Sequence, residues 1–175
     1  MWITELPREK YEGYELTFSY ASSAYYDLKV RTTENLFMAE FIRVPCPLFH
    51  REFTDTLFAP YWDDPHVYGL QNDDGLCAVI EVTPENRNNR LRITNLCVKE
   101  GYRRRGYGSL LMTKAREVAR AQGRRALILE TQSCNAGSIA FYLSQGLTFM
   151  GFNACEYSNQ DPEKHEVRIE MGCLL

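Results

Sequence analysis

The chain has 175 residues, of which 25% are charged and 45% hydrophobic, and its formal net charge is -3. This size predicts a single domain over residues 1–175, with a sizeable core. A slightly acidic chain has no overall attraction for nucleic acid, and no apolar run approaches membrane-spanning length. The first seven residues lack the basic and apolar regions of a signal peptide, so we expect a cytoplasmic protein.

The cysteines and histidines are scattered and form no Cys-x-x-Cys pair. This distribution favours free thiols in a reducing compartment over a disulfide framework. No zinc-ligand spacing occurs, so we predict no metal site, and no His partner pattern supports a cysteine nucleophile. The residues concerned are Cys46, Cys77, Cys97, Cys134, Cys155, Cys173, His50, His66 and His165.

The first third of the chain gives weak signals. Residues 14–20 and 25–31 alternate loosely and are predicted to be short strands. Residues 35–44 fit a strand or a helical turn, and the two prolines that follow would end any helix. Residues 48–61 are rich in aromatic side chains and are predicted to be irregular, with a short helix.

Five aspartates lie near the end of this region. They could attract a cationic substrate, or they could form a solvated surface and a turn, and the sequence leaves both interpretations open. These residues are Asp55, Asp63, Asp64, Asp73 and Asp74.

The middle of the chain is predicted to be an antiparallel meander of three strands. Residues 67–71 and 76–83 are apolar runs joined by a turn containing Asp-Gly, which is typical of a hairpin, and a polar turn at 84–89 leads to a strand at 91–98. In that strand the apolar residues move from odd to even positions. Either a bulge near Asn95 or burial of both faces would explain the change, and a bulge would free backbone N–H groups for an extended, amide-bearing ligand.

A basic, glycine-rich turn follows. Residues 103–108 read Arg-Arg-Arg-Gly-Tyr-Gly, and a helical pattern runs from Ser109 to Gln122. Glycines allow close backbone approach and positive φ, arginines bind phosphate oxygens, and a helix N-terminus favours anions. A basic surface turn or an RNA-binding turn would read similarly, but the position between strand and helix indicates a phosphate site.

The last third contains a second strand–helix pair. The apolar run at 126–131 predicts a buried strand parallel to the one before it, and a loop separates it from a helix at 136–145. Residues 147–152 and 166–173 are predicted strands joined by a polar connection. The fold class is therefore α+β, or mixed α/β.

As a set, these motifs resemble the GNAT superfamily of acyl-CoA N-acyltransferases, in order from about Leu91 to Phe152. Residues 129–132, which read Leu-Glu-Thr-Gln, are more similar to the streptothricin acetyltransferase branch. The resemblance implies a central mixed, mostly antiparallel sheet of six to seven strands flanked by helices, with a splayed parallel pair at the cofactor site. It is carried by Arg103, Gly106, Gly108, Asn135, Ala140, Phe141, Tyr142, Gly146, Leu147 and Phe149.

The resemblance also implies an activity. An acetyl group would pass directly from acetyl-CoA to a primary amine of a small cationic molecule, for example an antibiotic such as streptothricin. Residues 1–65 would form the acceptor side, 66–152 the acetyl-CoA-binding core, and 153–175 a C-terminal hairpin strand. A protein N-terminal or lysine acetyltransferase and a non-catalytic acyl-CoA-binding module remain alternatives, and a homodimer is compatible with the family.

Tyr142 stands where the family places the acid that protonates the leaving coenzyme A thiolate, with ordinary aromatic packing as the alternative. The streptothricin branch carries an acidic pair where this chain has Thr94 and Asn95, so the general base is not identified. Glu81 and Glu130 are candidates, directly or through water.

The cofactor-binding prediction covers the strand end, the basic turn and the second helix. The backbone N–H near Cys97 is the expected oxyanion donor. The predicted contacts are Leu96, Cys97, Val98, Arg103, Arg104, Arg105, Gly106, Tyr107, Gly108, Ser109, Asn135 and Tyr142.

Overall fold

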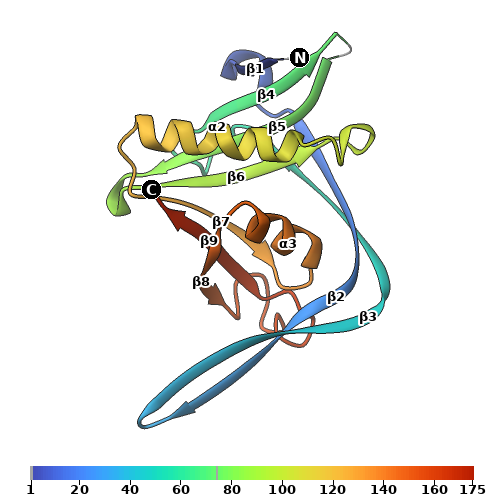
Figure 1. The fold of residues 1–175 in the computed structure, drawn as a ribbon, viewed down its shortest axis with the longest axis vertical. Coiled ribbons are helices and arrows are strands. Elements are labelled where there is room, and N and C mark those ends of the chain that lie inside the picture. The colour runs from blue at the N-terminus through green and yellow to red at the C-terminus, as the bar shows by residue number, and fades with distance from the viewer. Residues whose placement is uncertain (1, 74) are drawn as a thin grey trace. The chain divides into compact units, whose positions relative to one another are not determined.

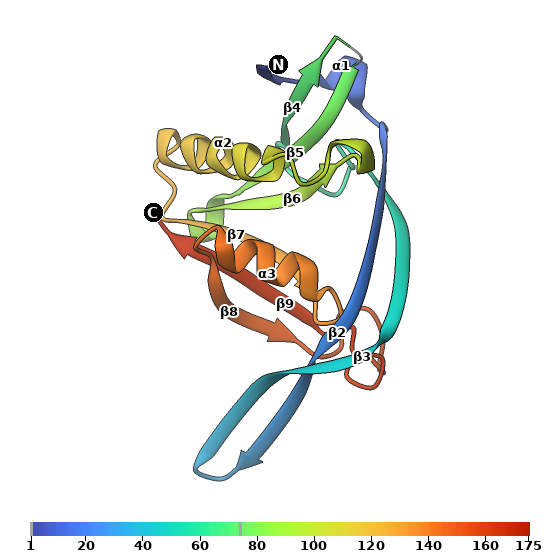
Figure 2. The same ribbon diagram turned by 45° about the vertical axis from the view of Figure 1, so that its right-hand side comes forward.

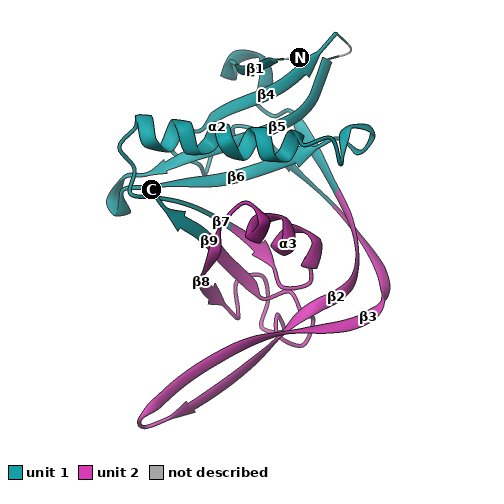
Figure 3. Ribbon diagram, viewed as in Figure 1, with its two compact units in different colours: residues 1–18, 53–129, 172–175 teal, residues 19–52, 130–171 magenta. Residues whose placement is uncertain are grey.

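A computed structural model describes residues 2–73 and 75–175, so the predictions that concern Asp74 fall outside the described residues. The chain divides into two compact units, coloured separately in Figure 3. Unit 1 comprises Met1–Phe18, Phe53–Leu129 and Gly172–Leu175, and unit 2 comprises Ser19–Glu52 and Glu130–Met171. The single-domain interpretation and its three functional segments stay predictions.

The described strands form one seven-stranded sheet, in the order β1-β4-β5-β6-β7-β9-β8, and a separate β2–β3 ribbon (Figure 1). The mixed α+β class is therefore confirmed. Of the described helices, none has the length and apolar character of a membrane span. The elements are β1 (Trp2–Glu5), α1 (Arg8–Tyr11), β2 (Glu15–Thr33), β3 (Leu36–Thr56), β4 (His66–Asn72), β5 (Gly75–Glu85), β6 (Arg90–Val98), α2 (Tyr107–Ala121), β7 (Ala126–Gln132), α3 (Ala136–Ser144), β8 (Thr148–Asn153) and β9 (Arg168–Leu174), with 3-10 turns at Asn86–Asn88 and Glu100–Tyr102.

The predicted meander is confirmed in unit 1. β4 and β5 pair as an antiparallel hairpin, and β5 pairs antiparallel with β6. α2 lies along these strands and begins two residues earlier than the sequence pattern indicates. It buries a periodic apolar stripe against the sheet, as expected for an amphipathic helix. The stripe consists of Leu111, Met112, Ala115, Val118 and Ala119.

Of the two explanations left open for the change of parity in β6, the structure shows the bulge. Glu81 faces Asn95 while the next residue, Val82, faces Ile93, so Thr94 is the extra residue. With this insertion, all four apolar residues of β6 lie opposite even-numbered residues of β5 and share one face of the sheet. The bulge therefore explains why the apolar residues of β6 change from odd to even positions in the sequence.

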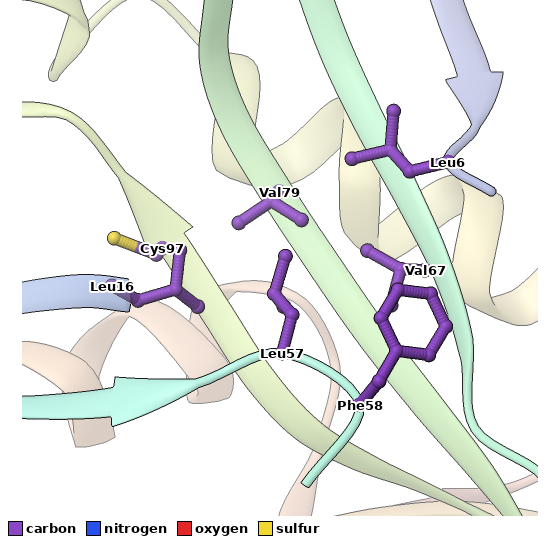
Figure 4. Packing of buried hydrophobic residues seen from close by; sticks show 7 residues of the cluster. All are labelled: Leu6, Leu16, Leu57, Phe58, Val67, Val79 and Cys97. Carbon is purple, nitrogen blue, oxygen red and sulfur yellow. The ribbon is translucent and has the colours of Figure 1, made fainter. Parts of the chain in front are cut away.

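The other face of these strands carries an apolar cluster from six places in the chain of unit 1 (Figure 4). Side chains alternate along a strand, so Val79 and Cys97 point away from the face that carries Ile80 and Leu96. The cluster fixes the turn after β3 against β4 and β5. It consists of Leu6, Leu16, Leu57, Phe58, Val67, Val79 and Cys97.

The predictions for the first third were largely wrong. Residues 14–20 and 25–31 are not separate strands but lie in the single long strand β2, and β3 runs through Pro45 and Pro47 to Thr56. No helix occupies residues 48–61. Each strand of a two-stranded ribbon has a free edge, so proline can be accommodated without breaking a ladder. The short elements β1 and α1 were not predicted from the sequence.

The predicted strands and helix of the last third are present in β7, α3, β8 and β9, with ends shifted by one or two residues. β6 and β7 pair in parallel, and their register covers only Arg90–Arg92 against Ala126–Ile128. This short register agrees with the expected splayed parallel pair.

Candidate active site

The basic turn leads into α2 through a residue with a left-handed backbone conformation, which glycine adopts most easily. Gly106 is the N-cap of the helix with φ 82°, and a Cβ placed there would meet no atom within 4 Å. The predicted positive φ is therefore confirmed at Gly106. It was wrong for Gly108, which lies in the first helical turn, whereas Arg104 has an unforeseen φ of 61°.

The N-terminus of α2 presents unpaired backbone donors. The first hydrogen bond runs from Leu110 N–H to the Gly106 carbonyl oxygen over 3.1 Å, and no side chain caps the helix. In the described part of the chain, the N–H groups of Tyr107, Gly108 and Ser109 have no acceptor. Together with the helix dipole, these three donors form a site suited to an anion.

The three arginines of the turn are exposed. Arg103 Nε donates to the Val98 carbonyl oxygen over 3.2 Å, which ties the turn to the end of β6. The Arg105 guanidinium lies 5.4 Å from the centre of the Tyr102 ring, and that ring lies 6.2 Å from the ring of Tyr107. The aromatic support for Arg105 was not foreseen. Contact with the Tyr102 ring restrains the Arg105 guanidinium, and with it part of the positive charge of the turn.

The end of β6 extends beyond its parallel ladder with β7, and its cysteine is buried. Cys97 Sγ is buried and donates to the Thr17 carbonyl oxygen at 3.6 Å, and burial raises the pKa of this thiol. On the other side of the strand, the parallel register with β7 ends at Arg92. Peptide groups between Ile93 and Val98 that point away from β5 therefore lie beyond that ladder.

Glu81 is fully buried and holds the bulge in place. Its Oε1 accepts the Phe58 N–H at 2.7 Å, and its Oε2 accepts the Thr94 hydroxyl at 2.7 Å and Asn95 Nδ2 at 2.9 Å. Phe58 has φ 57°, so this carboxylate also secures a turn in the left-handed region. Glu81 was a candidate from the sequence, but its partners could not be predicted, because bonds between distant side chains leave no periodic pattern.

One aspartate of the acidic region, Asp55, contacts an exposed tyrosine. Asp55 Oδ1 accepts the Thr56 N–H at 2.7 Å and lies 3.5 Å from the hydroxyl of Tyr61, which is 69% exposed. The pKa of Tyr61 is raised by partial burial and then by the negative charges of Asp55 and Glu81. The charges of Asp55 and Glu81 therefore both raise the pKa of the Tyr61 hydroxyl.

The other described aspartates of this region fit the solvated interpretation. Asp63, Asp64 and Asp73 are exposed. The Asp63 carbonyl oxygen accepts the Thr83 hydroxyl, and Asp64 lies 3.6 Å from His66 Nε2. Attraction of a cationic substrate stays a prediction for Asp55.

Tyr142 lies on α3 in unit 2, whereas the basic turn and Glu81 belong to unit 1. It is partly buried, and burial raises the pKa of its phenol to about 12. Its hydroxyl has no hydrogen-bond partner among the described residues. Tyr142 is therefore protonated at neutral pH, with a hydroxyl donor available.

The two remaining predicted residues of unit 2 have structural partners. Asn135 is the N-cap of α3, and its side-chain oxygen accepts the Ser138 N–H at 3.1 Å. Glu130 pairs with Arg168 at 2.5 Å, and Arg168 also pairs with Glu156 at 2.5 Å. These contacts hold the Glu130 carboxylate in an ion-pair network, which makes it a weaker candidate base than Glu81.

The described residues contain no group of three or more His, Cys, Asp or Glu side chains arranged to hold a metal ion. All six cysteines are free thiols.

The unpaired helix N-terminus, the basic turn and the bulged strand agree with one family. The chain belongs to the acetyltransferase (GNAT) family, whose profile matches residues 30–147. Streptothricin acetyltransferase of Streptomyces lavendulae is 32% identical over 102 residues, which are 58% of this chain and 54% of that protein. The matched region thus spans about half the length of that relative. Streptothricin acetyltransferase A of Bacillus subtilis (strain 168) is 27% identical over 127 residues, 67% of this chain and 73% of that protein.

Solved structures support the fold along almost the whole chain. A candidate streptothricin acetyltransferase from Bacillus anthracis str. Ames, in complex with acetyl coenzyme A, has a TM-score of 0.74 at 20% identity, covering 99% of this chain and 97% of that one. Nourseothricin acetyltransferase has a TM-score of 0.71 at 22% identity, with coverages of 99% and 97%. The predicted family and fold are confirmed.

Proposed function

We propose that this protein transfers an acetyl group from acetyl-CoA to a primary amine of a small cationic molecule, with streptothricin-like antibiotics as the leading acceptor class. The observation that carries the proposal is the set of three unpaired N–H groups at Tyr107–Ser109 beside the exposed arginines 103–105. Two relatives are named streptothricin acetyltransferases, and one structural neighbour contains acetyl coenzyme A.

The coenzyme A pyrophosphate would accept hydrogen bonds from the N–H groups of Tyr107, Gly108 and Ser109. Arg103, Arg104 and Arg105 would neutralise its charge from the exposed side of the turn. The amides of the pantetheine arm would pair with the backbone of residues 96–98, as an added strand does. Asn135 remains a predicted contact besides its capping role.

The chemistry requires the amine to attack the thioester carbonyl while the coenzyme A sulfur leaves. The backbone N–H near Cys97 would stabilise the oxyanion. A tyrosine with a pKa of about 12 is a weaker acid than a thiol, whose ordinary pKa is about 8.5. We therefore assign to Tyr142 the donation of a hydrogen bond to the leaving sulfur, which stabilises the thiolate without requiring complete proton transfer.

Loss of the ammonium proton would involve Glu81 through Thr94. Both oxygens of the Glu81 carboxylate already accept hydrogen bonds, and the side chain is fully buried. Thr94 is the bulge residue, is partly exposed, and donates its hydroxyl to Glu81. Its oxygen could accept a proton from the amine while its own proton moves to the carboxylate. Glu130 remains the secondary candidate base.

The acceptor would be attracted by Asp55 and Tyr61, whose carboxylate oxygen and hydroxyl lie 3.5 Å apart. A carboxylate beside an exposed aromatic ring suits an organic ammonium ion, because the carboxylate supplies charge and the ring a cation–π surface.

The test combines acetyl-CoA titration by calorimetry with mass spectrometry of a panel of streptothricin-type, aminoglycoside-like, polyamine and amino-acid amines. We expect binding together with one acetylated product class that is streptothricin-like. Acetylation of peptides alone would instead indicate a protein acetyltransferase, and binding without any product would indicate an acyl-CoA-binding module. Absence of binding at millimolar acetyl-CoA would contradict the proposal entirely.

A further inference from the structure

The β2–β3 ribbon enters unit 2 as residues 19–52, here called the arm. Figure 1 and Figure 2 both show β2 passing beside the place where β7 ends and α3 begins. The connection at this place is residues 133–135, here called the β7–α3 loop. The arm, this loop and Tyr142 all belong to unit 2, so their contacts lie within one compact unit.

The arm contacts the β7–α3 loop through a buried cysteine. The Tyr20 hydroxyl lies 3.3 Å from Cys134 Sγ, and the thiol donates to Gln132 Oε1 over 3.8 Å. Because the thiol proton is directed at Gln132, the Tyr20 hydroxyl is the donor to the sulfur. Burial raises the pKa of the Tyr20 phenol and of the Cys134 thiol. Both groups therefore keep their protons at neutral pH, and the chain of donors is complete.

The preceding residue of the loop is held at all three of its polar groups. Ser133 is fully buried; its N–H donates to the Val167 carbonyl oxygen at 2.9 Å, and its carbonyl oxygen accepts the Tyr26 N–H at 2.9 Å. Its hydroxyl donates to the His165 carbonyl oxygen at 2.6 Å. Since a buried polar group without a partner is unfavourable, these three bonds fix the path of the loop between β2 and the segment before β9.

The segment that accepts the Ser133 hydroxyl is itself fastened to the arm. The rings of Tyr25 and His165 are stacked with their centres 3.6 Å apart. Arg51 of β3 pairs with Glu166 at 3.0 Å. The arm thus contacts the β7–α3 loop directly and also through residues 165–166.

Helix α3 depends on this loop for its orientation. Asn135 caps the helix, and within the described chain its buried side chains are Ala136 and Ile139. Tyr142 follows Asn135 by seven residues, which is about 10 Å along a helix that rises about 1.5 Å per residue. Over that length a tilt of about 6° at the start of the helix moves Tyr142 by about 1 Å.

We propose that Ser133 and Tyr20 are positioning residues for Tyr142, which they hold in place through the β7–α3 loop. The inference rests on the proposed role of Tyr142 as the hydrogen-bond donor to the leaving sulfur. Misplacement of a reacting group by about 1 Å can cost on the order of a hundredfold in rate. The base of the arm therefore contributes to the chemistry without touching a substrate.

The test measures kcat at saturating substrate concentrations in Tyr20→Phe and Ser133→Ala, each alone and combined with Tyr142→Phe. With Tyr142 present, kcat should fall about tenfold in either variant, because a hydroxyl that fixes the loop is lost. In the Tyr142→Phe background the same changes should alter kcat by less than about twofold, because residues that act through one group are not additive. Tyr26→Phe is the matched control and should keep the wild-type kcat, since Tyr26 bonds to the loop through its backbone N–H.

A second measurement does not use activity. NMR of protein labelled at the tyrosine ring carbon Cζ follows the Tyr142 phenol as the pH is raised, with its signal assigned by comparison with Tyr142→Phe. Burial raises the pKa of this phenol to about 12. A loosened loop exposes the phenol, so in Tyr20→Phe and in Ser133→Ala it should ionise at a lower pH than in the wild type.

The outcomes distinguish the inference from the proposed function. Losses of kcat that persist in full in the Tyr142→Phe background overturn the inference alone, and so does an unchanged kcat in both single variants. An unchanged kcat in Tyr142→Phe itself overturns the role of that residue and the inference with it. A Tyr26→Phe control that loses as much activity as Tyr20→Phe would assign the effect to packing of β2 and overturn the inference. Circular dichroism establishes that each variant is folded, and if Ser133→Ala is not, Tyr20→Phe decides alone.

Discussion

The basic turn and the arm differ in how they are specified. The turn, residues 99–109, is built from bonds between neighbours in the chain, such as Arg103 to Val98 and Leu110 to Gly106. The arm, residues 19–52, depends on pairing between two long strands and exposes its apolar side chains. A local site can be formed by a short sequence pattern, whereas an arm of this kind requires support from outside the pattern.

The strongest test of the local site removes its charge. The triple variant Arg103→Ala/Arg104→Ala/Arg105→Ala is expected to weaken acetyl-CoA binding about a hundredfold, since each exposed and solvent-screened charge contact contributes up to about 1 kcal/mol. Calorimetric titration measures the change. Arg120→Ala, on the last turn of the same helix, is the control and should bind normally. Unchanged acetyl-CoA affinity in the triple variant would contradict the phosphate site proposed for the turn.

Tyr142 sharpens the comparison, because it lies in unit 2 with the arm but is proposed to serve the chemistry. Tyr142→Phe is expected to lower kcat about thirtyfold with nearly unchanged acetyl-CoA affinity, because a hydrogen bond to developing charge is worth about 2 kcal/mol. Steady-state kinetics and titration separate the two effects. Tyr157→Phe, a tyrosine of the same unit, is the control. Equal turnover in Tyr142→Phe would remove the assigned role.

Thr94 tests the bulge as a functional part of unit 1. Thr94→Ala is expected to lower kcat about tenfold, while Thr94→Ser should stay within about twofold of the wild type, because general base assistance often contributes 10²–10⁴-fold and water can replace part of it. The measurement is kcat with saturating acetyl-CoA. A loss of activity in both variants would indicate that Thr94 acts through packing of its methyl group rather than its hydroxyl.

The smallest expected effect is the pH dependence of stability. Burial raises the pKa of Tyr142 from its ordinary value near 10 to about 12. The folded state then holds this proton while the unfolded state loses it, so this contribution to stability is complete below about pH 10 and is lost as pH rises towards 12. Between these pH values, the melting temperature should fall less steeply with rising pH in Tyr142→Phe than in the wild type. Parallel curves would show that the phenol is not protected by folding.

The sequence predicted the elements whose signals are local. The hairpin around Gly75, the helix after Gly106 and the bulge near Asn95 all follow from turn residues, glycine positions or strand parity. The long strands β2 and β3 were missed because prolines and irregular alternation obscure a ribbon. Its pairing depends on residues far apart in the chain, which no single window contains.

The candidate site shows the same limit. Arg103–Ser109 could be read from spacing, and the residues of unit 2 could be named only through the family resemblance. The contacts of Glu81 with Phe58 and Thr94 join positions 23 and 13 residues away, and no short pattern encodes them. The support of Arg105 by Tyr102 likewise depends on the path of the backbone.

The buried carboxylate of Glu81 has a consequence for how acceptor preference could change during evolution. It ties the turn at Phe58 and the bulge at Thr94 to one charge, so a substitution that moves either segment leaves a buried anion short of a donor. Changes of acceptor specificity should therefore accumulate at exposed residues such as Tyr61. A library selected for a new acceptor would be expected to keep Glu81 invariant.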